Sequence, residues 1–185
     1  MGCGKSSVGR EIASRLGCPF TDLDEFIEKQ QGRTVASIFS TEGEAGFRAI
    51  ELEALMEVIS SYDGGTMYLS LGGGTLTTPA ARTIIASSTR CIYLRASVDT
   101  LVENLTLTGL TTRPLLSGIS SSQRPAVSSS PGGHTALSAV DKAALRRRVE
   151  ALLSERSDLY EETADVIIDI DSLTTAEIAS VVCGG

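Results

Sequence analysis

The sequence predicts a single α/β domain in which helices cover both faces of a parallel β-sheet. Segments with helical periodicity alternate with short apolar, β-prone segments, and this alternation is typical of parallel sheets with helical crossovers. The chain has 185 residues, of which 42% are hydrophobic. This is enough for one sizeable core but too little for two comfortable domains. We therefore expect residues 1–185 to form one domain.

The first half of the chain predicts a helix, a short extended segment, further helices and a strand. Val8, Ile12 and Leu16 recur with helical spacing, and Gly17 follows where a helix C-terminal cap belongs, so we expect a helix over residues 5–16. The next expected elements are an extended segment over 19–24, helical segments that begin near 24 and near 34, a helix opened by the capping-box spacing of 41–44, and a strand over 66–71. Arg48 and Glu51 lie off the apolar stripe of the 41–44 helix.

The second half continues the alternation and contains one segment of different composition. The expected elements are helices over 80–86 and 98–107, a strand over 90–95, a helix capped by Asp141, a strand over 165–170, and a closing helix that begins at 174–177. Residues 117–138 are rich in serine, proline and glycine and cannot bury enough apolar surface to order themselves. We expect residues 108–138 to be a lid and a Ser-rich flexible insertion within the domain.

Charge and composition exclude several classes of partner. The formal net charge of −7 disfavours nucleic acid. The longest apolar runs are far shorter than the roughly 20 residues that span a bilayer, and no secretory signal precedes the first helix, so we expect a cytoplasmic protein. Four widely separated cysteines with a single histidine make a zinc site a poor interpretation.

The residues before the first helix match the second half of a phosphate-binding loop. Gly4-Lys5-Ser6-Ser7, preceded by Gly2, fits the end of the pattern G-x-x-x-x-G-K-[ST]. In such loops glycines let consecutive backbone N–H groups close on phosphate oxygens at a helix N-terminus, while the lysine reaches the β- and γ-phosphates and the hydroxyl binds Mg²⁺. Taken alone, the segment is equally compatible with an ordinary N-terminal turn.

Polar residues follow the expected strands at the sheet edge where ligands of α/β proteins collect. Period-two geometry places Asp22 and Asp24 on one side of their extended segment. The glycines of residues 72–74 follow the next strand and would bring bare backbone to the same edge. Arg113 lies further along the chain, and Arg156 is expected to follow the helix capped by Asp141. Individually, these residues are equally typical of turns, caps and solvated side chains.

In their order and spacing, these motifs resemble the shikimate kinase family. The resemblance rests on the partial phosphate loop, Asp22-Leu23-Asp24, Ile38-Phe39, Glu42-Gly43-Glu44, Phe47-Arg48, Leu71-Gly72-Gly73-Gly74, Arg113-Pro114-Leu115-Leu116, Arg156, Leu159-Tyr160 and Ala164-Asp165. It covers nearly the whole chain apart from the Ser-rich segment. It implies a three-layer P-loop kinase fold with a parallel sheet of order 2-3-1-4-5, the first strand of which is absent from this chain.

The resemblance also implies an activity, cofactors and partners. The implied reaction is transfer of the γ-phosphoryl group of ATP to the 3-hydroxyl of shikimate in aromatic amino acid biosynthesis, with ATP and Mg²⁺ as cofactors. The implied partner is a small-molecule substrate, with no nucleic acid and no membrane, and the implied state is a monomer.

The implied site residues fall into three groups. Those that would hold the nucleotide are Gly2, Cys3, Gly4, Lys5, Ser6, Ser7 and Arg113. Those that would bind shikimate are Asp24, Arg48, Gly72, Gly73, Gly74 and Arg156. Those that would bind Mg²⁺ or its water shell are Ser6 and Asp22.

Three of these residues are implied to be catalytic. Lys5 would neutralise charge that develops on the transferred group, and Arg113 would close over the phosphates from the lid. Asp24 would orient the attacking hydroxyl and could deprotonate it. Arg48 and Arg156 would grip the substrate carboxylate, since a planar guanidinium matches a carboxylate with two parallel hydrogen bonds.

Two other functions remain open at this stage. Another small P-loop metabolite kinase, of the gluconate type, would also need arginines for a carboxylate-bearing acceptor. A truncated, non-catalytic relative would bind nucleotide without turnover. Retention of Lys5, Ser6, Asp24, Arg48 and Arg113 argues against the latter.

The resemblance also leads to a prediction about the N-terminus. Because the family pattern has an apolar strand and a first glycine ahead of the position of Met1, we expect the sequence to begin at an internal Met inside the phosphate loop. Loss of a central strand would leave buried backbone groups unpaired at about 1–3 kcal/mol each, so the 185-residue chain should be marginally stable and nearly inactive. Adding roughly ten residues, an apolar strand plus Gly-x, should raise the melting temperature and restore ATP binding. Full activity and a cooperative, high-temperature melt of the unextended chain would contradict this prediction.

Overall fold

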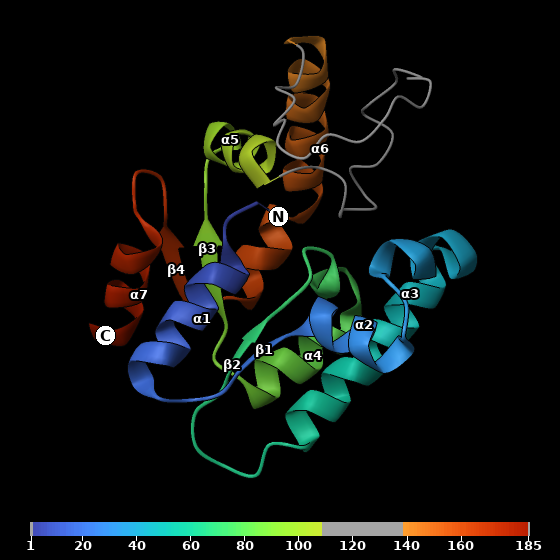
Figure 1. Cartoon of the computed structure of the whole chain (residues 1–185), viewed down its shortest axis with the longest axis vertical. Coiled ribbons are helices and arrows are strands. Elements are labelled where there is room, and N and C mark those ends of the chain that lie inside the picture. Colours follow the sequence, from blue (N-terminus) through green and yellow to red (C-terminus); the bar gives the residue numbers. More distant parts are fainter. Residues whose placement is uncertain (1, 109–138, 185) are drawn as a thin grey trace, which may run out of the picture.

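The computed structural model describes residues 2–108 and 139–184 and shows an arrangement of alternating helices and strands (Figure 1). The elements in chain order are α1 (Lys5–Leu16), β1 (Phe20–Asp22), α2 (Leu23–Gln31), α3 (Val35–Ser60), β2 (Tyr68–Ser70), the short 3-10 helix η1 (Thr75–Thr77), α4 (Pro79–Ser88), β3 (Ile92–Arg95), α5 (Val98–Thr108), α6 (Ala139–Thr163), β4 (Val166–Asp169) and α7 (Thr175–Gly184). No helix in the described ranges combines the length and the apolar character needed to cross a membrane. Most of the predicted lid and Ser-rich segment, from residue 109 to residue 138, lies outside the described residues.

The strands form two parallel pairs. β1 pairs with β2, and β3 pairs with β4, so the class predicted from the sequence, α/β with parallel strands, is confirmed. These pairs correspond to the 2-3 and 4-5 neighbours of the predicted order. No strand of the described ranges lies between them, and the complete order 2-3-1-4-5 stays a prediction. The register of the first pair sets Asp22 opposite Ser70, which brings two polar residues to one sheet edge.

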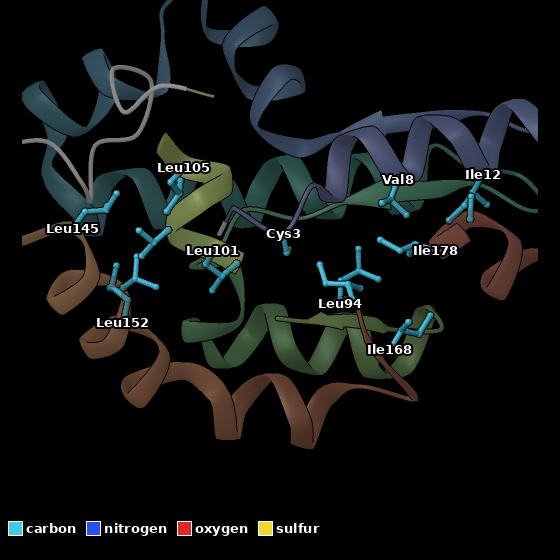
Figure 2. Packing of buried hydrophobic residues seen from close by; sticks show 14 residues of the cluster. Cys3, Val8, Ile12, Leu94, Leu101, Leu105, Leu145, Leu152, Ile168 and Ile178 are labelled. Atoms are coloured by element: carbon cyan, nitrogen blue, oxygen red, sulfur yellow. The ribbon is translucent and has the colours of Figure 1, made fainter. Parts of the chain in front are cut away.

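Each strand pair has its own hydrophobic core. The first core packs α1, α5, α6 and α7 against β3 and β4, and Figure 2 shows its labelled members: Cys3, Val8, Ile12, Leu94, Leu101, Leu105, Leu145, Leu152, Ile168 and Ile178. The second core packs α2, α3 and α4 against β2, and its most buried members include Leu23, Ile27, Ile38, Phe47, Leu55 and Ile85. Burying a side chain of this size stabilises the fold by about 1.5–3 kcal/mol.

Two helices connect the halves of the molecule. α1 contacts β1 and β2 on one side and α7 on the other, while α6 contacts α5 and also reaches α4 and η1 (Figure 1). Residues of α1 and α6 therefore come close to the strand ends of both halves. The predicted phosphate loop and Arg156 are placed by these two helices.

Some helix ends lie where the sequence predicts them, and others do not. Gly17 ends α1 in the left-handed conformation, with φ of 63°, as predicted. α7 is opened by a capping box in which the Thr174 N–H donates to Glu177 Oε2 at 2.8 Å. The capping box expected at residues 41–44 is wrong, because the Thr41 hydroxyl donates back to the Ser37 carbonyl at 3.0 Å and α3 continues through a kink at Gly43.

Two further boundaries differ from expectation. The extended segment ends at Asp22 instead of continuing to Asp24, because the Asp22 side chain caps α2 by accepting from the N–H groups of Asp24 and Glu25 at 3.1 and 3.4 Å. α6 begins at Ala139, ahead of the predicted cap Asp141, and continues to Thr163. Arg156 therefore lies within this helix, not after it.

Candidate active site

The N-terminus of α1 offers unpaired backbone N–H groups. Gly2 and Gly4 have φ of 71° and 73°, in the left-handed region that glycine adopts without strain. The Val8 N–H bonds to the Gly4 carbonyl at 2.9 Å, so the amides of the two serines before it are available to a ligand. No acidic side chain lies in the first turn of α1. Such a terminus favours an anion, and a phosphate group fits it.

Gly2 has little room for a side chain. A Cβ on Gly2 would lie 3.0 Å from Leu105 Cγ, and the Gly2 carbonyl accepts from Asn104 Nδ2 at 2.9 Å. The Cys3 side chain is 7% exposed and belongs to the first core. Of Cys3, only the backbone is therefore available to a phosphate.

A hydroxyl and a carboxylate meet beside this helix end. The Ser6 hydroxyl donates to the Asp22 carboxylate and lies 3.5 Å from the Ser70 hydroxyl. These are hard oxygen donors of the kind that Mg²⁺ takes, alongside phosphate oxygens and water. The described residues hold no cluster of three or more His, Cys, Asp or Glu that could bind a metal ion without such outside ligands. The donor set therefore fits Mg²⁺ that arrives with a nucleotide.

Asp24 lies in the first turn of α2, between the N-terminus of α1 and a second set of charged groups. Burial raises the pKa of its carboxyl to about 6, and the negative charges of Asp22 and Glu51 act in the same direction. Lys5 and Arg48 oppose this shift in pKa. Asp24 is therefore a stronger base than an ordinary aspartate and is still ionised at neutral pH.

Arg48 and Glu51 form a buried ion pair on α3. Arg48 Nη1 donates to Glu51 Oε2, and the other Glu51 oxygen accepts from the Thr75 hydroxyl at 2.7 Å. Glu51 is 1% exposed. The Arg48 guanidinium also lies over the Phe47 ring, 5.2 Å from its centroid. These contacts hold the guanidinium in one place.

The segment that contains Gly72, Gly73 and Gly74 makes room for these charges. A Cβ on Gly72 would lie 2.7 Å from Glu51 Oε1 and 3.2 Å from Asp24 Oδ1. A Cβ on Gly74 would lie 2.1 Å from Arg48 Nη2. We call residues 72–74 the glycine turn. Any side chain at its first or third position would displace a charged group of the site.

Arg156 reaches the same turn from α6. Its Nη1 donates to the Gly73 carbonyl at 3.1 Å, and the Tyr160 hydroxyl donates to the same oxygen. Two guanidinium groups from different helices therefore meet at consecutive residues of the glycine turn.

Both guanidinium groups lack an acceptor at one nitrogen. The Nε atoms of Arg48 and Arg156 are buried and have no hydrogen-bond partner among the described residues. A buried donor left unpaired costs about 1–3 kcal/mol, and more when it is charged. Two such donors at one turn indicate a site for an anion, and a planar guanidinium suits a carboxylate.

The structure brings together most of the residues that the sequence singled out. Lys5, Ser6, Asp22, Asp24, Arg48, the glycine turn and Arg156 lie at the α1 N-terminus, the strand ends and the adjacent turn. Arg113 lies outside the described residues. The sequence patterns assign no role to Glu51, Thr75 or Tyr160. The one feature that points to Glu51 and Tyr160 is spacing: they follow Arg48 and Arg156 by three and four residues, which is the spacing of neighbours on a helix surface.

The sequence is similar to those of known proteins. A family model described as shikimate kinase matches residues 1–183. The chain is 38% identical over 168 residues to a shikimate kinase of Mycobacterium avium, which covers 91% of this chain and 78% of that protein. It is 35% identical over 182 residues to a shikimate kinase of Streptomyces avermitilis, which covers 98% of this chain and 88% of that protein.

The fold is also similar to those of solved structures. The fold is similar to that of a shikimate kinase from Acinetobacter baumannii in complex with shikimate, with a TM-score of 0.79, 28% identity, and coverage of 99% of this chain and 86% of that one. It is also similar to a shikimate kinase from Bacteroides thetaiotaomicron, with a TM-score of 0.77, 27% identity, and coverage of 100% and 90%.

The raised pKa of Asp24 leads to a prediction about stability. A carboxyl whose pKa is raised to about 6 by folding stabilises the fold when protonated, and this contribution is lost as the pH rises through 6. At pH 8, Asp24→Asn should therefore raise the free energy of unfolding by about 1–2 kcal/mol and the melting temperature by roughly 2–8 °C, while activity is lost. The gain should shrink toward pH 4.

The control for this prediction is Asp63→Asn, which neutralises an exposed aspartate. Its melting temperature should follow that of the parent at every pH. An Asp24→Asn variant that is less stable than the parent at pH 8 would contradict the assigned environment of Asp24.

Proposed function

Because the chain belongs to the shikimate kinase family, we propose that it transfers the γ-phosphoryl group of ATP to the 3-hydroxyl group of shikimate. The observation that carries this proposal is the pair of buried, unpartnered Nε donors of Arg48 and Arg156. They lie beside Asp24 and the phosphate-binding end of α1, so a carboxylate-bearing acceptor and a nucleotide would meet at one place.

The nucleotide half of the reaction uses the N-terminus of α1. The amides of Ser6 and Ser7 would hold phosphate oxygens, and Lys5 would neutralise charge that develops on the transferred group. Mg²⁺, held by the Ser6 hydroxyl and the Asp22 carboxylate, would supply further charge neutralisation at the phosphates. Phosphoryl transfer depends chiefly on positioning and charge stabilisation, and this set of residues supplies both.

The acceptor half uses the two arginines and Asp24. The carboxylate of shikimate would bind between Arg48 and Arg156, where its oxygens satisfy the unpaired Nε groups. Asp24 would then accept a hydrogen bond from the attacking hydroxyl and take its proton. Its raised pKa makes that proton transfer easier than for an ordinary aspartate.

Further elements of the proposal come from the family. Arg113 would act as the lid arginine that closes over the phosphates, and its segment lies outside the described residues. We also expect a monomer in the cytoplasm that requires Mg²⁺. An assay of ATP consumption with shikimate and with gluconate as acceptors tests the proposed function. Turnover with gluconate alone, or with neither acceptor once the chain carries the N-terminal extension described above, would overturn it.

The carboxylate assignment predicts the effect of Arg48→Lys. A lysine keeps the charge but cannot reproduce the guanidinium fork, and a hydrogen bond to a charged group contributes about 1.5–3 kcal/mol. We therefore expect kcat/KM for shikimate to fall roughly 10- to 150-fold, while KM for ATP changes little.

The matched control is Arg33→Lys, which changes an arginine that pairs with Glu42 away from the site. Parent and variants are compared in one N-terminal background, either the 185-residue chain or the extended chain. Unchanged kcat/KM in Arg48→Lys would show that the carboxylate binds elsewhere.

The proposed role of Asp24 also predicts the pH dependence of activity. Because protonated Asp24 cannot accept the hydroxyl proton, kcat/KM for shikimate should fall as the pH decreases through about 6. Glu51→Gln removes one of the negative charges that raise the pKa of Asp24, so its acid limb should move to lower pH. An acid limb near pH 4 in the parent would contradict the role of Asp24 as a base in this environment.

A further inference from the structure

The orientation of the glycine turn must be imposed by its neighbours. Three consecutive glycines leave the backbone with no Cβ to restrict it, so Gly72, Gly73 and Gly74 have more conformational freedom than other residues. The Thr75 N–H holds one end of the turn by donating to the Gly72 carbonyl at 3.2 Å. The central peptide is held from α6, which packs against η1 (Figure 1).

Two side chains of α6 hold the Gly73 carbonyl. Arg156 and Tyr160 are four residues apart and so lie on one face of the helix. Arg156 Nη1 donates to the Gly73 oxygen at 3.1 Å, and the Tyr160 hydroxyl donates to the same atom. A carbonyl oxygen has two lone pairs, and both are used here. The oxygen of Gly73 therefore points toward α6.

This contact also determines where the next backbone donor points. The described peptide bonds are all trans, so the Gly74 N–H points opposite to the Gly73 carbonyl, away from α6. Among the hydrogen bonds of residues 2–108 and 139–184, none uses the Gly73 or Gly74 N–H as donor. The turn thus has backbone donors available for an acceptor molecule.

Tyr160 is well suited to a fixed position. Its ring packs against Tyr93 of β3, with centroids 5.2 Å apart, so the hydroxyl is aimed by a rigid side chain. Burial raises the pKa of Tyr160, against the opposing charge of Arg156, so the hydroxyl keeps the proton that it donates.

We propose that Tyr160 is a positioning residue for acceptor binding, because its hydroxyl holds the Gly73 carbonyl to which Arg156 also donates, and so fixes the Arg156 guanidinium for the carboxylate of the acceptor. This inference rests on the proposed function and deepens it. Tyr160 acts through the turn and through Arg156, and its hydroxyl is already bonded to protein, so it does not itself touch the reacting atoms.

Tyr160→Phe tests the inference because it keeps the ring and removes only the hydroxyl. We expect KM for shikimate to rise about 3- to 10-fold, as for the loss of one hydrogen bond, with kcat and KM for ATP within about twofold of the parent. The melting temperature should stay within about 2 °C. A merely structural role would lower the melting temperature and affect the kinetics with both substrates.

Shikimate methyl ester provides a second readout. The ester lacks the anionic carboxylate that the oriented donors recognise, so Tyr160→Phe should leave its KM within about twofold of the parent value. The preference of the enzyme for shikimate over its ester should therefore fall by the same 3- to 10-fold. Equal losses with both acceptors would overturn the inference.

The matched control is Tyr62→Phe. The Tyr62 hydroxyl also donates to a backbone carbonyl, that of Thr66 at 2.8 Å, but in a loop away from the site. Its kinetics should equal those of the parent. A parent that turns over shikimate, with an unchanged KM in Tyr160→Phe, overturns the positioning role alone. A parent that carries the N-terminal extension and shows no shikimate-dependent turnover overturns the proposed function, and the positioning role with it.

Discussion

The buried ion pair between Arg48 and Glu51 is the interaction on which the rest of the site depends. Glu51 is 1% exposed, and a carboxylate in that position needs partners for both oxygens. Arg48 supplies one and the Thr75 hydroxyl the other, so the pair connects α3 to η1 and aims the guanidinium at the glycine turn. Removing one partner of such a pair costs about 3–5 kcal/mol, which makes Arg48 important for stability as well as for its proposed role in binding the acceptor.

The glycine turn follows from this ion pair. Because Glu51 occupies the space where a Cβ of Gly72 would lie, and Arg48 the space of a Cβ at Gly74, the backbone comes within reach of both charges only if these positions are glycine. The same absence of side chains removes the restriction on the Gly73 peptide, which then needs Arg156 and Tyr160 to hold it. The three glycines thus have two consequences: the backbone can approach the charged groups closely, and the Gly73 peptide must be oriented by its neighbours.

Local patterns predicted well what local forces determine. The bounds of α1 follow from apolar periodicity and Gly17, and the chemistry of the strand ends follows from residues that directly succeed β-prone runs. The ends of α3 and α6 were less predictable. Thr41 bonds back to the helix instead of capping a new one, and α6 continues past the apolar pattern to carry Arg156. The roles of Glu51 and Tyr160 come from contacts over 24 and 87 residues of sequence, which spacing along a helix does not reveal.

On the proposed function, the charges of the site allow the bound substrate to change the pKa of Asp24. The site contains three positively charged side chains, Lys5, Arg48 and Arg156, and three carboxylates, Asp22, Asp24 and Glu51. The pKa of Asp24 is raised by the other two carboxylates and lowered by Lys5 and Arg48. On the proposed function, a shikimate carboxylate bound at Arg48 brings another negative charge close to Asp24 and offsets part of the stabilisation that Arg48 gives to the ionised form. Because the two carboxylates repel each other, binding of the acceptor would raise the pKa of Asp24 and so increase its basicity. On the same proposal, the arginines that would hold the substrate also couple its binding to the proton transfer to Asp24.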